Sequence, residues 1–199
     1  MSGPDFLAAK RYILERLRQE LPQNLYYHGY HHTRDDVFPA VKRLAALEEL
    51  DDEDRLLLST GALYHDSGYL EQYHDNEVIG VRLVNAVLPQ FGYSDEQLRI
   101  IGEVIMATRL PQAPDTHLEA IMCDADLDSL GRADFFVVSH RLRLEMAAYG
   151  HPSTVRDWYE GQLLFLRQHR YFTESARRLR EGGKEKNVQE IRRLLANSD

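Results

Sequence analysis

Histidines and aspartates gather in three short segments of the sequence, and these side chains are the best suited to chemistry. Three of the nine histidines lie within residues 27–33, His65 and Asp66 are adjacent, and three aspartates fall within residues 124–128. Imidazole and carboxylate groups together suit divalent manganese, iron, cobalt, nickel or zinc. Four such ligands leave coordination positions open for water and substrate, so that a bound ion can activate water and neutralise a phosphate oxygen. The first hypothesis is therefore a metal site.

The His65–Asp66 pair follows an apolar run at residues 56–64, which predicts a helix in the centre of the fold. A carboxylate is costly to bury in such surroundings unless it is paired or bound to a metal. Taken alone, the pair has a second interpretation, a hydrogen-bonded helix end.

His28 and His32 are four residues apart, so on a helix they would share one face. His31 would lie about 100° around that helix from His32, and we expect it to take no part. Surface decoration remains the alternative interpretation of the spaced pair.

The aspartates at positions 124, 126 and 128 lie among apolar residues. This pattern favours a helix on which Asp124 and Asp128 share a face and Asp126 points elsewhere. A calcium loop is disfavoured because its twelfth position, which should be Glu, is Phe135.

Taken in order, His32, then His65–Asp66, then Asp126 resemble the H…HD…D signature of the HD superfamily of metal-dependent phosphohydrolases. The resemblance covers roughly residues 25–131. The HD dipeptide alone is unspecific, and the ordered set carries the resemblance.

The residues around this signature agree with it. Residues 27–33 resemble the YHN-x-x-H segment of the family's cyclic-nucleotide phosphodiesterase branch, with Gly29 replacing the usual Asn. Residues 62–68 resemble the family's apolar-HD-x-G helix end, and residues 121–128 resemble its DAD segment, whose second Asp usually supplies the last ligand.

The resemblance implies that His32, His65, Asp66 and Asp126 hold one divalent ion (Mn, Mg, Fe, Co, Ni or Zn). The residues alone leave open whether Asp124 rather than Asp126 is the last ligand.

The resemblance also implies roles in catalysis. His28 matches a histidine that protonates the leaving oxygen, a role that needs a neighbour able to keep it protonated near neutral pH. Glu77 could orient or deprotonate the attacking water, and His74 could contact phosphate or a second metal; a solvated helix start is the alternative for both. Arg34 and Arg109, which lie near the motifs in sequence, are candidates to bind the substrate phosphate.

Two-metal members of the superfamily carry further histidines between the HD pair and the final Asp. Here that interval holds only His74 and His117, and Thr108 falls near the place where another His is expected. A second metal is therefore disfavoured, and so are the di-iron oxygenases that use the same scaffold.

Helices must position these residues, because apolar residues recur at helical spacing almost everywhere. We expect an all-α fold of the HD-domain, PDEase-like type with nine or ten helices. It should form a single domain over residues 1–199, with the motifs in residues 25–131 and the helices of residues 132–199 completing the fold.

Local signals mark several helix boundaries. Starts are predicted at Asp51–Asp54, Ser94, Thr116 and Ser153. Gly182–Gly183 should separate a short helix from a last amphipathic one over residues 184–197, which packs on its own domain by default but could instead join an oligomer.

Composition narrows the partners and the location. The net charge of -8 disfavours broad binding to nucleic-acid polymers or anionic membranes. Cys123 is the single cysteine, the N-terminus lacks the apolar core of a signal peptide, and no apolar stretch approaches the ~20 residues that span a bilayer. We therefore expect a soluble cytoplasmic protein with a small phosphorylated substrate.

The leading hypothesis is hydrolysis of a phosphoester, of a nucleotide in particular, by metal-activated water. The match at His28 tilts the choice toward a diester, and a monoester stays open. The alternatives are an iron-dependent HD-domain oxygenase and a non-catalytic module that binds a nucleotide or a protein partner.

Overall fold

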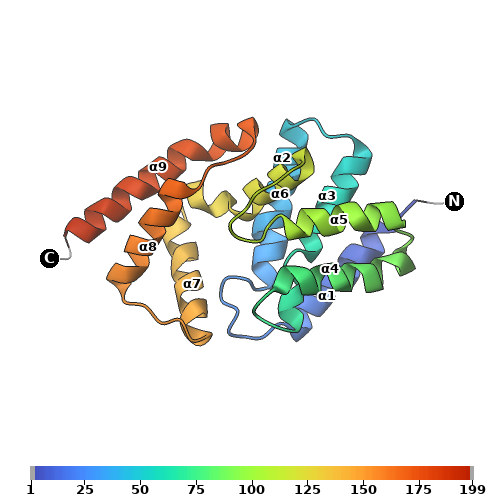
Figure 1. Cartoon of the computed structure of the whole chain (residues 1–199), viewed down its shortest axis with the longest axis horizontal. Coiled ribbons are helices and arrows are strands. Elements are labelled where there is room, and N and C mark those ends of the chain that lie inside the picture. Colours follow the sequence, from blue (N-terminus) through green and yellow to red (C-terminus); the bar gives the residue numbers. More distant parts are fainter. Residues whose placement is uncertain (1–2, 198–199) are drawn as a thin grey trace.

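Within residues 3–197, the helical periodicity of the sequence is realised as nine α-helices (Figure 1). The structure, a computed structural model, describes residues 3–197, and no strand occurs in that range. The all-α expectation is confirmed. Residues 1–2 and 198–199 of the expected 1–199 domain lie outside the described part, and the single-domain assignment stays a prediction. The α-helices are α1 (Phe6–Glu20), α2 (Phe38–Leu47), α3 (Asp52–Tyr64), α4 (Asn76–Val87), α5 (Asp95–Met106), α6 (His117–Asp126), α7 (Phe135–Ala148), α8 (Val155–Gln168) and α9 (Glu174–Ala196).

Helix α3 lies at the centre of the part of the molecule that carries the motifs, in contact with α1, α2, α5 and α6. The apolar run predicted to be buried forms the last nine residues of α3, 56–64. At its end, the buried Tyr64 side chain donates from its hydroxyl to the carbonyl of Ala9 at 3.0 Å, so the polar atom of this side chain is paired. Each fully buried aliphatic side chain adds about 1.5–3 kcal/mol to the free energy of unfolding. The buried side chains of this first core include Ile13, Leu44, Leu58, Ile101 and Ile121.

A second core joins the C-terminal helices α7, α8 and α9 to the short 3-10 turn Asp128–Gly131. Figure 1 shows these three helices gathered at the end of the molecule away from the N-terminus. The second core consists of Leu130, Phe135, Leu166, Val188 and Ile191. The boundary between the two hydrophobic cores leaves room for a cavity.

Most of the predicted helix starts are present. Asp51 caps α3, and Ser94 forms a complete capping box with Gln97 at the start of α5. At the start of α6, the Thr116 hydroxyl accepts from the backbone N–H of Glu119. The capping box is incomplete, because the Glu119 carboxylate accepts from the Asp115 N–H and the Thr116 hydroxyl and not from the Thr116 N–H.

The predicted cap at Ser153 is wrong by one residue. Thr154 caps α8, and its hydroxyl accepts from the N–H of Asp157 at 3.1 Å. Thr154 stands three residues before that N–H, the spacing that a capping side chain needs. The Ser153 carbonyl accepts from Arg143 instead.

The predicted break at Gly182–Gly183 is also wrong, because α9 runs unbroken through both glycines. A Cβ at Gly183 would overlap the carbonyl oxygen of Gly131, whereas a Cβ at Gly182 would meet nothing within 4 Å. Gly183 therefore lets α9 approach the 3-10 turn closely, and this contact outweighs the helix-weakening effect of glycine. No helix of residues 3–197 is long and apolar enough to cross a membrane.

These two glycines give a matched pair for testing the packing of α9. Gly183→Ala should destabilise the protein by about 1–3 kcal/mol because backbone must move to admit a methyl group. Gly182→Ala should stabilise it by about 0.5–1 kcal/mol, the helix preference of Ala over Gly. Chemical denaturation of both variants measures the difference, and equal stabilities would show that α9 does not contact Gly131 in this way.

Candidate functional site

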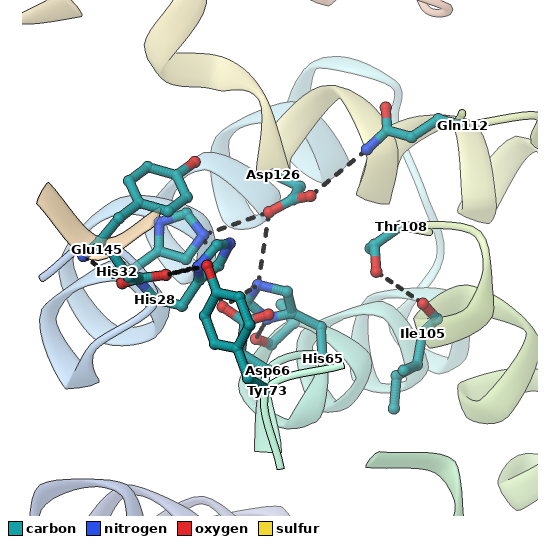
Figure 2. A network of polar contacts seen from close by, with 12 residues as sticks. His28, His32, His65, Asp66, Tyr73, Ile105, Thr108, Gln112, Asp126 and Glu145 are labelled. Atoms are coloured by element: carbon teal, nitrogen blue, oxygen red, sulfur yellow. Dashed lines mark hydrogen bonds and ion pairs between the residues drawn. The ribbon is translucent and has the colours of Figure 1, made fainter. Parts of the chain in front are cut away.

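His32, His65 and Asp66 form a buried group that could hold a metal ion. Each side chain offers a ligand atom, and these atoms all lie within 4.8 Å of one another. His65 directly follows α3, Asp66 comes next, and His32 begins a short π-helical turn, His32–Val37, that leads into α2. Figure 2 shows His32, His65 and Asp66 brought together with Asp126 from the end of α6.

The unpaired atoms in this group test whether a cation fits. His65 Nδ1 lies 2.9 Å from the carbonyl oxygen of Ala62, which can only accept, so this nitrogen carries a hydrogen, and in the neutral ring Nε2 has a free lone pair. His65 Nε2 is 3.2 Å from Asp66 Oδ2, and both atoms are buried without a hydrogen-bond partner in the described part of the chain. Two buried acceptor atoms that face each other need a positive charge between them. The donor set therefore fits a divalent ion.

Asp126 lies against the same group. Its Oδ1 is 3.3 Å from His32 Nε2 and 3.5 Å from His65 Nε2. Ligand bonds of about 2 Å at right angles put neighbouring ligand atoms about 3 Å apart. The observed separations are close to this spacing. Gln112 donates from Nε2 to the other oxygen, Oδ2, at 3.4 Å and helps to orient the carboxylate.

Asp124 faces away from the group. Its carboxylate accepts from the backbone N–H groups of Phe172 and Thr173 at 2.8 Å each, and from the Thr173 hydroxyl at 2.7 Å. It thereby joins α6 to the start of α9. Asp126, not Asp124, therefore lies beside the histidines.

The prediction that His28 and His32 share a helix face is wrong, because His28 lies in the connection before the π-helical turn. The backbone N–H groups of Tyr27 and His28 donate to Glu145 Oε2 at 2.8 and 3.0 Å. These donors are therefore not available to an extended helix. His28 Nδ1 lies 2.5 Å from Glu145 Oε1, and the His28 ring stacks on Tyr69 with centroids 4.7 Å apart.

Nearby charges set the protonation of the histidines. Burial alone would lower the pKa of His28, but the hydrogen bond to Glu145 and the charges of Asp66 and Asp126 raise it above its usual 6.5. Burial likewise opposes the charged form of His65, yet Asp66 and Asp126 raise its pKa well above the usual value. Burial would raise the pKa of Asp66, but the neighbouring histidines lower it. The two carboxylates thus favour a positive charge among these side chains, which protons on the histidines or a bound cation can supply.

The group opens into a cavity of about 840 Å³ that lies between the two cores. His28, Asp66 and Asp126 line it, and helices α7 and α8 form much of its remaining wall. The cavity is within the size range of small-molecule sites, about 300–1,000 Å³.

The remaining predicted site residues divide into two sets. His74, Glu77 and Arg109 all line the cavity, and Arg109 donates to Asp75 at 2.6 Å. Arg34 does not line it: it is exposed, and its guanidinium binds Asp35 and lies over the Tyr30 ring. Arg34 is one residue past Thr33 on the π-helical turn and faces solvent.

Thr108 lies on the cavity wall, where a further histidine could have extended the metal site. Its hydroxyl instead donates to the carbonyl of Ile105 at 2.8 Å, as Figure 2 shows. Within residues 3–197 and away from this group and Asp126, no set of three His, Cys, Asp or Glu side chains offers ligand atoms this close together.

Sequence reasoning missed Glu145 and Gln112. Glu145 is fully buried on α7, 117 residues after His28, and only the fold brings the two together. Its one sequence signal is an acidic residue at a buried position of the α7 pattern. Gln112 stands in a loop with no signal at all.

Comparisons with protein-family models and with curated proteins find no match. Among solved structures, a similar fold occurs in the crystal structure of Bacillus subtilis YpgQ in complex with ADP. The two chains are 21% identical over 96% of each, with a TM-score of 0.67. At this identity the likeness shows a shared fold.

Metal binding gives a direct test of the buried group. Asp66→Asn keeps the size of the side chain but removes its charge, so the variant should lose most bound Mn²⁺ or Zn²⁺ and the thermal stabilisation that these ions give the wild type. His31→Ala is the matched control, because His31 neighbours His32 but lies outside the group. Elemental analysis and thermal melts with added metal measure the effect. Wild-type metal content in Asp66→Asn would rule the site out.

Proposed function

We propose that this chain is a metal-dependent phosphohydrolase of the HD superfamily that cleaves a phosphoester of a nucleotide. One observation carries the proposal: the unpaired His65 Nε2 and Asp66 Oδ2 face each other at the edge of the same cavity as the His28–Glu145 pair. A cation site and a proton donor on one cavity are what hydrolysis of a phosphoester needs.

His32, His65, Asp66 and Asp126 would hold one divalent ion. Such an ion supplies Lewis acidity, lowering the pKa of a water and neutralising charge on a phosphate oxygen. The Ala62 carbonyl fixes the His65 ring so that Nε2 faces inward, and Gln112 orients the Asp126 carboxylate. These outer contacts hold the donor atoms in place before a substrate arrives.

His28 acts as the general acid. Glu145 accepts the Nδ1 hydrogen, which leaves Nε2 to donate its proton to the leaving oxygen as the phosphorus–oxygen bond breaks. The backbone bonds from Tyr27 and His28 to the same carboxylate, together with the stacked Tyr69 ring, fix the position of the imidazole. Glu145 is thus a positioning residue that also keeps His28 charged.

The other residues on the cavity wall bind and orient. Glu77, in the first turn of α4, orients the attacking water, and His74 contacts the phosphate. Arg109 contributes a guanidinium that can exchange Asp75 for a substrate phosphate. Arg34 has no part in this proposal because it lies outside the cavity.

The nucleotide substrate is supported by the ADP in the YpgQ structure, whose fold this chain shares. An oxygenase with two irons is less well supported, because the described residues offer one close group of ligands. A non-catalytic binding module would leave the His28–Glu145 pair without a purpose.

Loss of the ligand residues should abolish turnover without unfolding the protein. His65→Ala and Asp66→Asn should each reduce phosphoester hydrolysis by at least about 10³-fold while the far-UV circular dichroism stays helical. A panel of nucleotide mono- and diesters with added Mn²⁺ measures the activity, and His140→Ala, on the exposed side of α7, is the control. The proposal fails if either ligand variant hydrolyses the substrate at the wild-type rate.

The proton-donor role predicts a pH dependence with a definite sign. A raised pKa keeps His28 protonated above pH 6.5, so the alkaline limb of the activity profile, which reports the loss of its proton, should lie above that pH. Glu145→Gln keeps the shape but removes the charge, so the pKa of His28 should fall and the alkaline limb should move to lower pH.

Rate against pH for the wild type and Glu145→Gln tests this, with the exposed Glu103→Gln as control. His28→Ala should lower kcat by about 10²–10⁴-fold and remove the alkaline limb. An unmoved limb in Glu145→Gln would contradict the assignment of His28.

A further inference from the structure

The cavity is larger and more apolar than a phosphate group requires. Its wall away from the metal group is formed by one face of α7 and one face of α8. On α8 the residues at spacings of four and three, Trp158, Gln162 and Phe165, all line the cavity. On α7 the apolar contributions include Leu142 and Met146.

A chain of hydrogen bonds crosses this apolar wall. Trp158 Nε1 donates to Ser139 Oγ at 2.9 Å, and Ser139 Oγ is 3.3 Å from Gln162 Oε1. An indole N–H can only donate, so the Ser139 hydroxyl accepts from Trp158 and gives its own hydrogen to Gln162. The Gln162 amide is thereby oriented with its oxygen toward Ser139.

This orientation leaves the Gln162 amino group as a free donor. Among the described residues, no group accepts a hydrogen bond from Gln162 Nε2, although the side chain is half-buried. A purely aliphatic ligand would cover this donor without pairing it, which costs free energy. A ligand with an acceptor at the edge of a flat apolar ring would pair it and use the aromatic surfaces beside it.

We infer that the α7–α8 wall binds the heteroaromatic base of the substrate. Gln162 donates from Nε2 to a ring nitrogen or carbonyl oxygen of the base, and Trp158 and Phe165 contact the ring. This inference rests on the proposed function, because it places the phosphate of the same molecule at the metal group. Arg109 is the one Arg or Lys among the described residues lining the cavity, so the base, rather than a run of phosphates, supplies much of the recognition.

The single tryptophan of the chain makes the wall directly observable. Titration with adenosine, guanosine, cytidine and uridine should change Trp158 fluorescence for at least one nucleoside. Ribose 5-phosphate, which has the sugar and phosphate but no base, should bind at least about tenfold more weakly as judged by the same signal. No response to any nucleoside, or an equal response to ribose 5-phosphate, would overturn the inference.

The same titration in Asp66→Asn separates this inference from the proposed function. Nucleosides lack phosphate, so their binding should survive the loss of the metal ligand. Nucleoside binding without turnover in the wild type would defeat the hydrolase proposal but keep the base site. Turnover of a nucleotide without any nucleoside response would do the reverse.

Gln162→Leu tests the specific donor, because leucine keeps the bulk and removes the hydrogen bond. It should weaken the preferred nucleoside at least about tenfold and raise KM for the matching nucleotide with little change in kcat. The differences among the four nucleosides should shrink as well. Gln168→Leu, an exposed position at the end of the same helix, is the matched control. Wild-type preference and affinity in Gln162→Leu would overturn the role of Gln162.

Discussion

Two buried acceptor atoms that face each other constrain the whole arrangement. His65 Nε2 and Asp66 Oδ2 lie 3.2 Å apart, and both atoms are buried without a hydrogen-bond partner in the described residues. Such an arrangement is unfavourable unless a proton or a cation lies between the two atoms. Two other segments, the π-helical turn that begins at His32 and the end of α6 at Asp126, place their side chains beside these two atoms.

The fold meets this constraint by building the site at the boundary of two cores. The first core, around α3, holds the ligand residues rigidly at helix ends. The second core, of α7 to α9, supplies the opposite wall and the carboxylate of Glu145. Asp124 joins the two parts through the start of α9, so this aspartate, two residues before Asp126, has a structural role.

Sequence reasoning anticipated what depends on local pattern. The all-α fold and the helix starts at Asp51 and Ser94 follow from spacing and burial. The gathering of the HD pair with His32 and Asp126 is implied by the resemblance to the HD superfamily. Sequence reasoning failed where a distant contact decides. His28 lies outside the helix, where Glu145 binds its backbone, and Gly183 stays within α9, where Gly131 lies against it. Arg34 is exposed on the π-helical turn and binds Asp35. Glu145 itself could not be found, since nothing near it in the sequence refers to His28.

One helix, α7, carries both Glu145 and the apolar residues Leu142 and Met146, which border the proposed base site. The imidazole of His28 is therefore positioned by the same helix, α7, that a ligand at the base site would contact. A ligand that packs against the apolar residues of α7 can therefore also affect the position of Glu145 and, through it, of the His28 imidazole. A ligand that occupies only the part of the cavity near the metal group has no such effect. Discrimination between substrates can thus arise in the speed of the reaction as well as in the strength of binding, without any moving lid.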